Sequence, residues 1–433
     1  MFLHIGEPKT GTTFLQQVMW SNRAELAAQG VVLPGHHGQD HFRASQDLRG
    51  IQKLPSDPAG SWTGEWEILA RQAAQSAQAG RTAVISHELF SAADAQQAGR
   101  AVASLQPAEV HIVITVRDMA SLLPAEWQET VKHRNARAWE DWLGDVIDTE
   151  SVAEDRRQWW FWRVHDTLAI GRLWSEFVPP ERIHVITMAP RGAGTSLLWR
   201  RFASLLGIDP GSVDISRARP NASLGLAEIE FLRRLNQALP AEIPDWFYMW
   251  NVKEAVAHKA LADRPAGDRL TLPADREAWA KDQAEVLIAG LQNSGYDLIG
   301  DLSELRPRQH ATPSASPAGQ PAEQMLDAAV QAAAALVVNQ YRKEYPPKGR
   351  PSGGRRAGVG AAARGRARSA GAGQAERGGG ISRALAGRIE SAVASSPRLK
   401  RTVREISSRS AAARRLRILV WRVLERSRTR GRV

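Results

Sequence analysis

The chain has 433 residues, no cysteine and 43% hydrophobic residues. The absence of cysteine excludes disulfides, thiolate metal sites and cysteine nucleophiles. The length exceeds that of one average domain but fits a single large α/β domain with appendages. The chain starts without a basic, apolar leader, and no apolar run approaches the roughly 20 residues of a membrane span. We therefore expect a cytoplasmic protein.

The charge is unevenly distributed. The formal net charge is +11, yet residues 341–433 alone hold 25 Lys and Arg against 5 Asp and Glu, a balance of +20. Residues 1–340 consequently carry a balance of −9. The body of the protein is mildly acidic, and the basic character belongs to the C-terminal segment.

Short β-branched runs alternate with helical patterns through about the first half of the chain, which is typical of a parallel sheet covered by helices. The runs are almost continuously apolar, as in strands that are buried on both faces. The predicted strands are Phe2–Ile5, Ala83–Ser86, Val110–Val116 and Arg182–Thr187.

Helical periodicity fills most of the intervals, while 36–59 and 134–158 are expected to be loops. The predicted helices are Thr13–Gln29, Thr63–Ala79, Ala92–Leu105, Ser121–Arg134, Phe161–Phe177, Ser196–Leu206, Leu224–Leu239 and Asp275–Asn293.

Composition divides the chain into five parts. An α/β domain is predicted for 1–305, and a Pro/Ser-rich linker for 306–323. An Ala-rich helix follows at 324–345. The Gly/Arg-rich segment 346–380 is expected to be disordered, because it lacks the apolar area that would offset its ordering entropy. Segment 381–433 is predicted to be a basic tail with an amphipathic helix.

The basic tail has three interpretations. An arginine-rich amphipathic helix suits an anionic membrane surface, which would attach the protein peripherally to the inner membrane. The second is a disordered tail that keeps the protein soluble or binds a protein partner. A nucleic-acid arm is the least favoured of the three.

The first predicted strand runs directly into Gly6-Glu7-Pro8-Lys9-Thr10-Gly11-Thr12-Thr13, and a helical pattern follows. A glycine-bounded loop that closes onto a helix N-terminus presents backbone N–H groups and a positive dipole end to an anion. In the G-x-x-x-x-G-K-[ST] loop of nucleotide triphosphatases the lysine stands where this chain has Thr12. Here Lys9 precedes that place by three residues. The alternative to phosphate binding is a plain helix cap beside a solvated lysine.

The string from Pro8 to Gln16, P-K-T-G-T-T-x-L-Q, resembles the 5′-phosphosulfate loop of sulfotransferases that use 3′-phosphoadenosine 5′-phosphosulfate (PAPS), particularly bacterial members. The resemblance implies a three-layer α/β/α domain with a central parallel sheet, related to the P-loop fold of nucleotide kinases. It also implies that Lys9 contacts the 5′-phosphate and the bridging oxygen. The cofactor-binding loop would comprise Pro8, Lys9, Thr10, Gly11, Thr12 and Thr13.

Arg117 follows the strand Val110–Val116, where ligands gather beyond the carboxyl ends of parallel strands. The resemblance assigns it to the 3′-phosphate of PAPS, although an ion pair with Asp118 is the alternative. The family places a serine two helical turns later, but this chain has Ala125, and Ser121 is the nearest hydroxyl. Family members often complete this site ahead of the helix expected from Leu224, where this chain has Arg217, Arg219 and Asn221.

His87 and Glu88 follow the strand Ala83–Ser86. The family carries its general base at this location, as a histidine or a glutamate. A neutral imidazole or a partly desolvated carboxylate can accept the proton. The resemblance thus gives Lys9, Glu88 and His87 as catalytic candidates, with Glu88 ahead of His87, and a structural role remains the alternative for both.

The resemblance therefore implies a sulfotransferase that moves a sulfuryl group from PAPS to a hydroxyl or amine of a carbohydrate, glycolipid or small molecule. No metal is expected, and the cluster His36–His41 is interpreted as a surface or substrate-facing loop. A nucleotide-dependent kinase or triphosphatase is the alternative enzyme, although no Lys-[ST] pair follows Gly11. The other alternative is a catalytically inactive membrane- or nucleic-acid-associated adaptor, which Ala125 would favour.

Overall fold

The structure is a computed structural model that describes residues 1–51, 61–152, 156–188, 195–218, 223–264, 267–308 and 316–344. The low-complexity segment 346–380 and the basic tail 381–433 lie outside the described residues, as do Arg219 and Asn221. The compact unit considered below spans Met1–Pro346.

Six parallel strands form one sheet in the order β2-β3-β1-β4-β5-β6. The prediction of an α/β fold with a central parallel sheet is confirmed. The two strands that were not predicted have only two and three residues, which is too short for a hydrophobic pattern to be recognised. The strands are β1 (Phe2–Gly6), β2 (Val31–Val32), β3 (Thr82–Ser86), β4 (His111–Val116), β5 (Ile183–Thr187) and β6 (Asp297–Ile299).

The helices mostly follow the predicted ones. They are α1 (Thr12–Ser21), α2 (Arg23–Ala28), α3 (Gly38–Leu48), α4 (Glu65–Gln78), α5 (Ala95–Ser104), α6 (Met119–Lys132), α7 (Trp139–Val152), α8 (Trp160–His165), α9 (Thr167–Ser175), α10 (Thr195–Leu205), α11 (Leu226–Ala238), α12 (Asp245–Tyr248), α13 (Glu277–Gln292) and α14 (Ala322–Glu344). Two short helical elements also matter below, η1 (Glu88–Ala92) and the π-helical η6 (Met249–Leu261).

Two of the predicted helices are each divided in two by a polar side chain. Asn22 separates α1 from α2, because its side-chain amide donates to the carbonyl of Val18 at 2.8 Å and ends the first helix. Asp166 separates α8 from α9 and caps α9 by accepting from the N–H of Ala169 at 3.1 Å. The expectation of loops at 36–59 and 134–158 was wrong in part, since α3 and α7 lie there.

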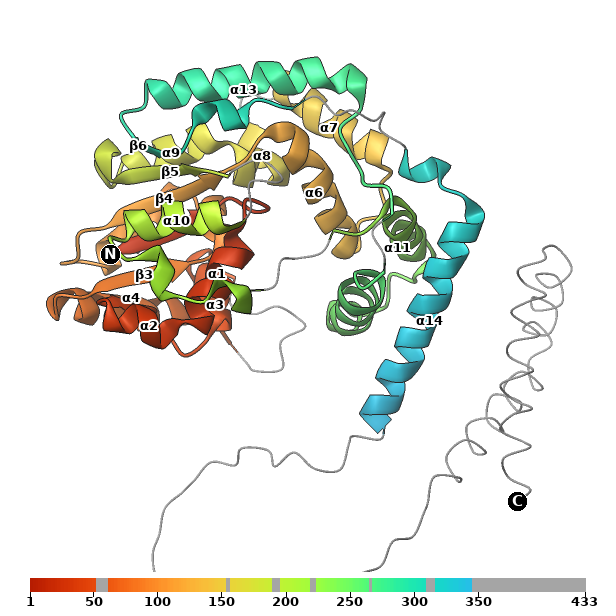
Figure 1. The fold of residues 1–433 in the computed structure, drawn as a ribbon, viewed down its shortest axis with the longest axis horizontal. Coiled ribbons are helices and arrows are strands. Elements are labelled where there is room, and N and C mark those ends of the chain that lie inside the picture. Colours follow the sequence, from red (N-terminus) through yellow and green to blue (C-terminus); the bar gives the residue numbers. More distant parts are fainter. Residues whose placement is uncertain are drawn as a thin grey trace, which may run out of the picture. The chain divides into compact units, whose positions relative to one another are not determined.

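Helices cover both faces of the sheet (Figure 1). Alternate strand residues point to opposite faces, so Leu3 and Ile5 pack in one core with α4, α5, α9 and α13. On the opposite face, Val84 and Val113 pack in a second core with α1, α2 and α10. The arrangement is therefore helix, sheet, helix.

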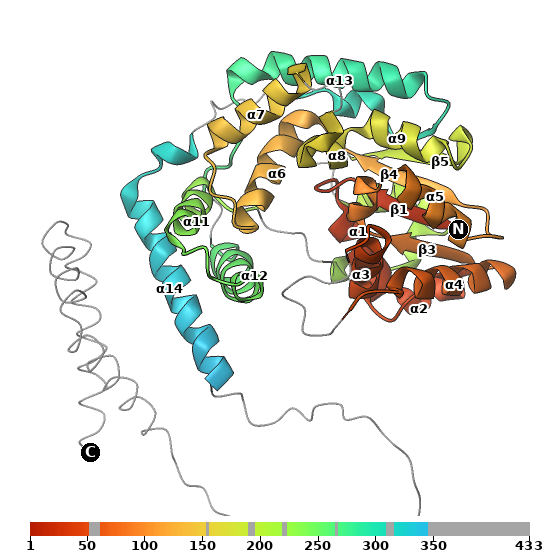
Figure 2. The same ribbon diagram turned by 180° about the vertical axis from the view of Figure 1, so that it is seen from behind.

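A third core belongs to helices that gather beyond the strand ends from which α1 and α6 start (Figures 1 and 2). It contains residues of α6, α7, α11, η6 and α14, with Trp127 and Trp139 in edge contact. Ala328 and Ala332 of α14 are buried in this core. The compact unit therefore continues beyond Leu305 and includes the Ala-rich helix. Within the described ranges, no helix is long and apolar enough to cross a membrane.

Candidate functional site

The loop between β1 and α1 has an unusual backbone conformation. Gly6 and Gly11 have φ angles of 100° and 90°. A Cβ atom on Gly6 would lie 2.7 Å from the backbone Cα of Glu88, and one on Gly11 would lie 2.4 Å from a Leu198 methyl carbon. Both positions therefore require glycine. Lys9 also has a positive φ of 60°, a conformation that is uncommon for a residue with a side chain and often marks a functional constraint.

The loop leads into α1 at Gly11, and no side chain in the described part of the chain caps this helix end. The first turn of an α-helix leaves its backbone N–H groups without acceptors inside the helix. Those of Thr12 and Thr13 thus stand at a positive dipole end next to the loop lysine. This geometry suits an anion.

Hydroxyl groups beneath the loop fix it to the sheet. The Thr10 hydroxyl donates to the Glu7 carbonyl at 2.5 Å and lies 2.6 Å from the Thr115 hydroxyl. The His4 ring lies between the hydroxyls of Ser86 and Thr115, at 2.8 and 3.3 Å. Burial lowers the pKa of His4 to about 4, so the ring is neutral at physiological pH. The Thr10 side chain is thus part of the framework, and its hydroxyl is turned away from an anion at the loop.

Arg117 lies beside the loop, as its position at the end of β4 predicted. Its guanidinium donates to the carbonyl of Lys9 at 3.3 Å. Asp118 caps α6, because its side chain accepts from the backbone N–H of Ser121 at 2.8 Å. This local role explains why an acidic residue follows the arginine. The structure therefore brings together Lys9 and Arg117, with Ser121 one turn into α6.

Glu88 and His87 lie on the other side of the loop, at the start of η1. The amide of Gln16 in α1 donates to Glu88 Oε2 at 3.2 Å, and the same oxygen is 4.0 Å from His87 Nδ1. Burial opposes ionisation of Glu88, but His87, the Glu88 backbone N–H and Gln16 outweigh it and hold the pKa below its ordinary value. Burial lowers the pKa of His87 more than Glu88 raises it. The pair is therefore a carboxylate beside a neutral imidazole.

The tautomer of His87 limits what it can do. Its Nδ1 accepts a hydrogen bond from the backbone N–H of Leu89 at 3.2 Å, so in the neutral ring the proton is on Nε2. A ring in this form has no free lone pair to take a proton from a ligand. The Glu88 side chain is 24% exposed, against 11% for His87, and is ionised. Of the two, Glu88 is better placed to act as a base.

The Lys9 side chain contributes to a group that we call the α6 lysine cluster, formed by Lys9, Glu129, Lys132 and Lys253. Lys9 Nζ donates to Glu129 Oε2 at 2.6 Å, and Lys253 Nζ donates to Oε1 at 3.0 Å. Lys132 Nζ is 3.9 Å from Oε2. Burial opposes ionisation of Glu129, but the adjoining His133 and the three lysines hold its pKa well below the usual value.

A second buried group, which we call the His165 triad, lies one helical turn away and consists of Glu7, His165 and Glu126. The His165 nitrogens are 3.5 Å from Glu7 and 3.6 Å from Glu126, distances of ion pairs without hydrogen bonds. Burial would lower the pKa of His165, but the two carboxylates raise it to about 9. Thr167 donates a 2.5 Å hydrogen bond to Glu7. This triad fixes the loop residue Glu7 to α6 and α8.

The remaining sequence candidates have structural partners. Arg217 is a surface residue that contacts the Ser21 carbonyl and Glu25. In the histidine-rich segment, Asp40 caps α3 by accepting from the N–H groups of His36 and His37. In the part of the chain that the structure describes, no group of three or more His, Asp or Glu side chains could hold a metal ion.

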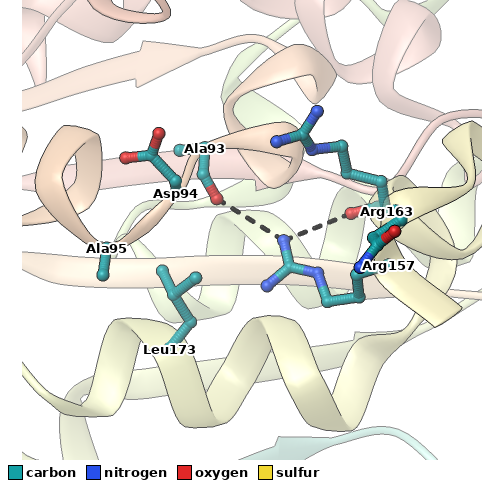
Figure 3. Close-up of a pocket in the computed structure, with 7 residues that line it drawn as sticks. Ala93, Asp94, Ala95, Arg157, Arg163 and Leu173 are labelled. Atoms are coloured by element: carbon teal, nitrogen blue, oxygen red, sulfur yellow. Dashed lines mark hydrogen bonds between the residues drawn. The ribbon is translucent and has the colours of Figure 1, made fainter. Parts of the chain in front are cut away.

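A surface hollow begins at Ala93, directly after η1 in the chain (Figure 3). The Arg157 guanidinium crosses it and donates to the carbonyls of Ala93 and Arg163 at 3.4 and 3.3 Å. The hollow is lined by Ala93, Asp94, Ala95, Arg157, Gln158, Arg163 and Leu173, none of which belongs to the predicted site.

Sequence reasoning missed Glu129, Lys132, Lys253 and the His165 triad. Glu129 follows Ala125 by one helical turn, so a helical projection from Arg117 could have found it. Lys253 lies 124 residues after Glu129, and no local signal connects them. A scan against protein-family models and searches of curated proteins and of solved structures found no match for this chain.

Proposed function

We propose that this protein is a PAPS-dependent sulfotransferase whose donor site is the loop from Gly6 to Thr13. The observation that carries the proposal is the loop itself. A lysine with a positive φ stands between two obligatory glycines, at the N-terminus of an uncapped helix. An anion with a bridging oxygen would meet backbone N–H groups on one side and the Lys9 ammonium on the other.

The chemistry of sulfuryl transfer suits this arrangement. The acceptor oxygen or nitrogen attacks sulfur while the bond between sulfur and the 5′-phosphate oxygen breaks, and the leaving 5′-phosphate gains charge. Preorganised cations and dipoles at that oxygen lower the barrier. Lys9 donates one hydrogen bond to Glu129, and an ammonium group has three donors, so it can serve the leaving oxygen without losing Glu129.

Glu88 is the proposed base. It is ionised, partly exposed and joined to α1 through Gln16, so it lies close to the helix that would hold the 5′-phosphate. It would take the acceptor proton as the new bond to sulfur forms. His87 would hold the start of η1 in place, because its Nδ1 accepts from the Leu89 N–H. Arg117, next to Lys9, is proposed to bind the 3′-phosphate.

Calorimetry with two nucleotides tests the proposal. The intact chain is titrated with adenosine 3′,5′-bisphosphate in the absence of divalent metal, and separately with ATP and Mg²⁺. We expect saturable bisphosphate binding that exceeds ATP binding at least tenfold, and Arg117→Ala should reduce this difference. Preference for ATP with Mg²⁺ would indicate a kinase or triphosphatase instead. If neither nucleotide binds, the loop is not a donor site and the proposal is wrong.

A further inference from the structure

The α6 lysine cluster contains more positive charge than its protein partners neutralise. One carboxylate, Glu129, faces the ammonium groups of Lys9, Lys253 and Lys132. The cluster thus sets three ammonium groups against one carboxylate, a surplus of two positive charges. Among the described residues, the one further nitrogen or oxygen that a hydrogen bond of the cluster reaches is His133 Nε2, which the Lys253 ammonium contacts. Buried charges are normally paired, so a surplus of this kind favours an anionic ligand.

Lys132 makes the surplus most evident. Only 7% of this residue is exposed, and among the described residues its ammonium makes no hydrogen bond, because the contact with Glu129 is 3.9 Å long. Burial lowers the pKa of Lys132 to about 8, and Lys9 and Lys253 add to this effect while Glu129 opposes it. At neutral pH the group is a protonated donor on a largely buried side chain, and no described residue supplies it with a hydrogen-bond acceptor.

Lys132 lies at the opposite end of α6 from the predicted 3′-phosphate contacts. Arg117 and Ser121 are at the start of α6, whereas Lys132 ends this 14-residue helix, roughly 20 Å along its axis. Lys253 reaches the same point from η6, which packs against α6. A nucleotide held by the loop and Arg117 already has a partner for each phosphate. Lys132 and Lys253 adjoin the Lys9 ammonium around Glu129 and are left for another anion next to the loop.

We infer that the ammonium groups of Lys132, Lys253 and Lys9 bind an oxyanion group of the acceptor, which is a carboxylate, sulfate or phosphate. This inference rests on the proposed function, because the ligand is an acceptor substrate only if the adjoining loop, which shares Lys9, binds the donor. The acceptor class would then be an acidic one, such as an acidic sugar or a phosphorylated molecule. The surplus charge would attract it, and Glu129 would keep the lysines in place.

Inorganic sulfate, at constant ionic strength, is the probe for this site. Its binding is measured by calorimetry on the intact chain, alone and saturated with adenosine 3′,5′-bisphosphate. Lys132→Gln and Lys253→Gln are compared with Lys259→Gln, an exposed lysine of η6 that serves as a matched control. Circular dichroism melting verifies that each variant is folded, and two independent cluster variants guard against misfolding of one.

We expect wild type and Lys259→Gln to bind sulfate in both states, and both cluster variants to bind at least tenfold more weakly, since each loses one charge-assisted bond. Absence of saturable sulfate binding, or equal binding by all variants, would overturn the anion site. If bisphosphate displaces sulfate and the cluster variants lose bisphosphate affinity, the lysines belong to the donor and the acceptor assignment is wrong. Sulfate binding that depends on Lys132 in a protein without bisphosphate affinity would retain the anion site and refute the donor site.

Discussion

Two glutamates one turn apart on α6 lie in opposite electrostatic surroundings. Glu126 belongs to the His165 triad, where two carboxylates share one imidazolium and every side chain is at most 6% exposed. Glu129 belongs to the α6 lysine cluster, where three ammonium groups share one carboxylate that is 24% exposed. The triad is closed to solvent, whereas the cluster is partly exposed at Lys9 and Glu129 and is rich in donors. Stability should therefore depend on the first group and binding on the second.

Lys9→Met should give the largest effect of any substitution in the cluster. We expect turnover with PAPS to fall by about 10³-fold or more, since removing one preorganised donor at the leaving oxygen costs about that much. The melting temperature should change little, because Glu129 keeps Lys253 as a partner. Transfer is followed with isotope-labelled PAPS, and Lys259→Met is the control. Turnover within threefold of wild type would show that Lys9 does not serve the leaving group.

His165→Leu, which removes the central residue of the triad, should give the largest loss of stability. It leaves Glu7 and Glu126 buried without a counter-charge, so the free energy of unfolding should fall by about 3–5 kcal/mol. Urea denaturation at pH 6.5 measures the change. His133→Leu, at a side chain that is 51% exposed in the other group, should change stability by less than about 1 kcal/mol.

The pH dependence of the same variant identifies the cause. The pKa of His165 is about 9 in the folded protein and near 6.5 when unfolded, so the folded state binds more protons between these values. The stabilisation is fully present below pH 6.5 and declines as pH rises toward 9. The stability difference between wild type and His165→Leu should therefore shrink across this window. A constant difference would mean that packing, not charge, explains the loss.

Glu88 and His87 form a third group of ionisable residues, which is partly exposed, and they test whether an ionised carboxylate next to the loop acts in catalysis. Glu88→Gln should lower turnover by about 10²–10⁴-fold with bisphosphate affinity retained. His87→Gln, which can keep a side-chain acceptor for the Leu89 N–H, should lower it by less than about tenfold. Turnover and bisphosphate affinity are measured on the same preparations. A larger loss for His87→Gln would reverse the assignment of the base.

Lys132→Met should change stability less than His165→Leu does, and with the opposite sign. The folded pKa of Lys132 is about 8 and the unfolded value near 10.5, so the folded state binds fewer protons between these values and the penalty is fully present below pH 8. Glu129, Lys9, Lys253 and His258 face this group. We expect the variant to be more stable by about 1–3 kcal/mol at pH 7. The gain should vanish as pH rises toward 10.5, and denaturation at pH 7 and 10 measures it. A loss of stability at pH 7 would contradict an unsatisfied buried charge.

The sequence by itself determined the parallel α/β fold, because strand patterns that are apolar on both faces need helices on both faces. It also determined the loop, since Gly6, Lys9 and Gly11 act within six residues and their spacing is visible in the chain. It placed Arg117 and Glu88 near that loop, because the carboxyl ends of neighbouring strands meet at one edge of a sheet.

Only the tertiary structure decided what surrounds the loop lysine. The contacts of Lys9 with Glu129, and of Glu7 with His165, join residues 120 and 158 positions apart, and no short-range pattern encodes them. It also decided that α14 packs into the helical core, because an Ala-rich pattern does not show what covers it. The sign of the charge around each α6 glutamate depends on which distant helix faces it, η6 or α8. Burial then amplifies this difference, since a charge away from water interacts strongly with its neighbours.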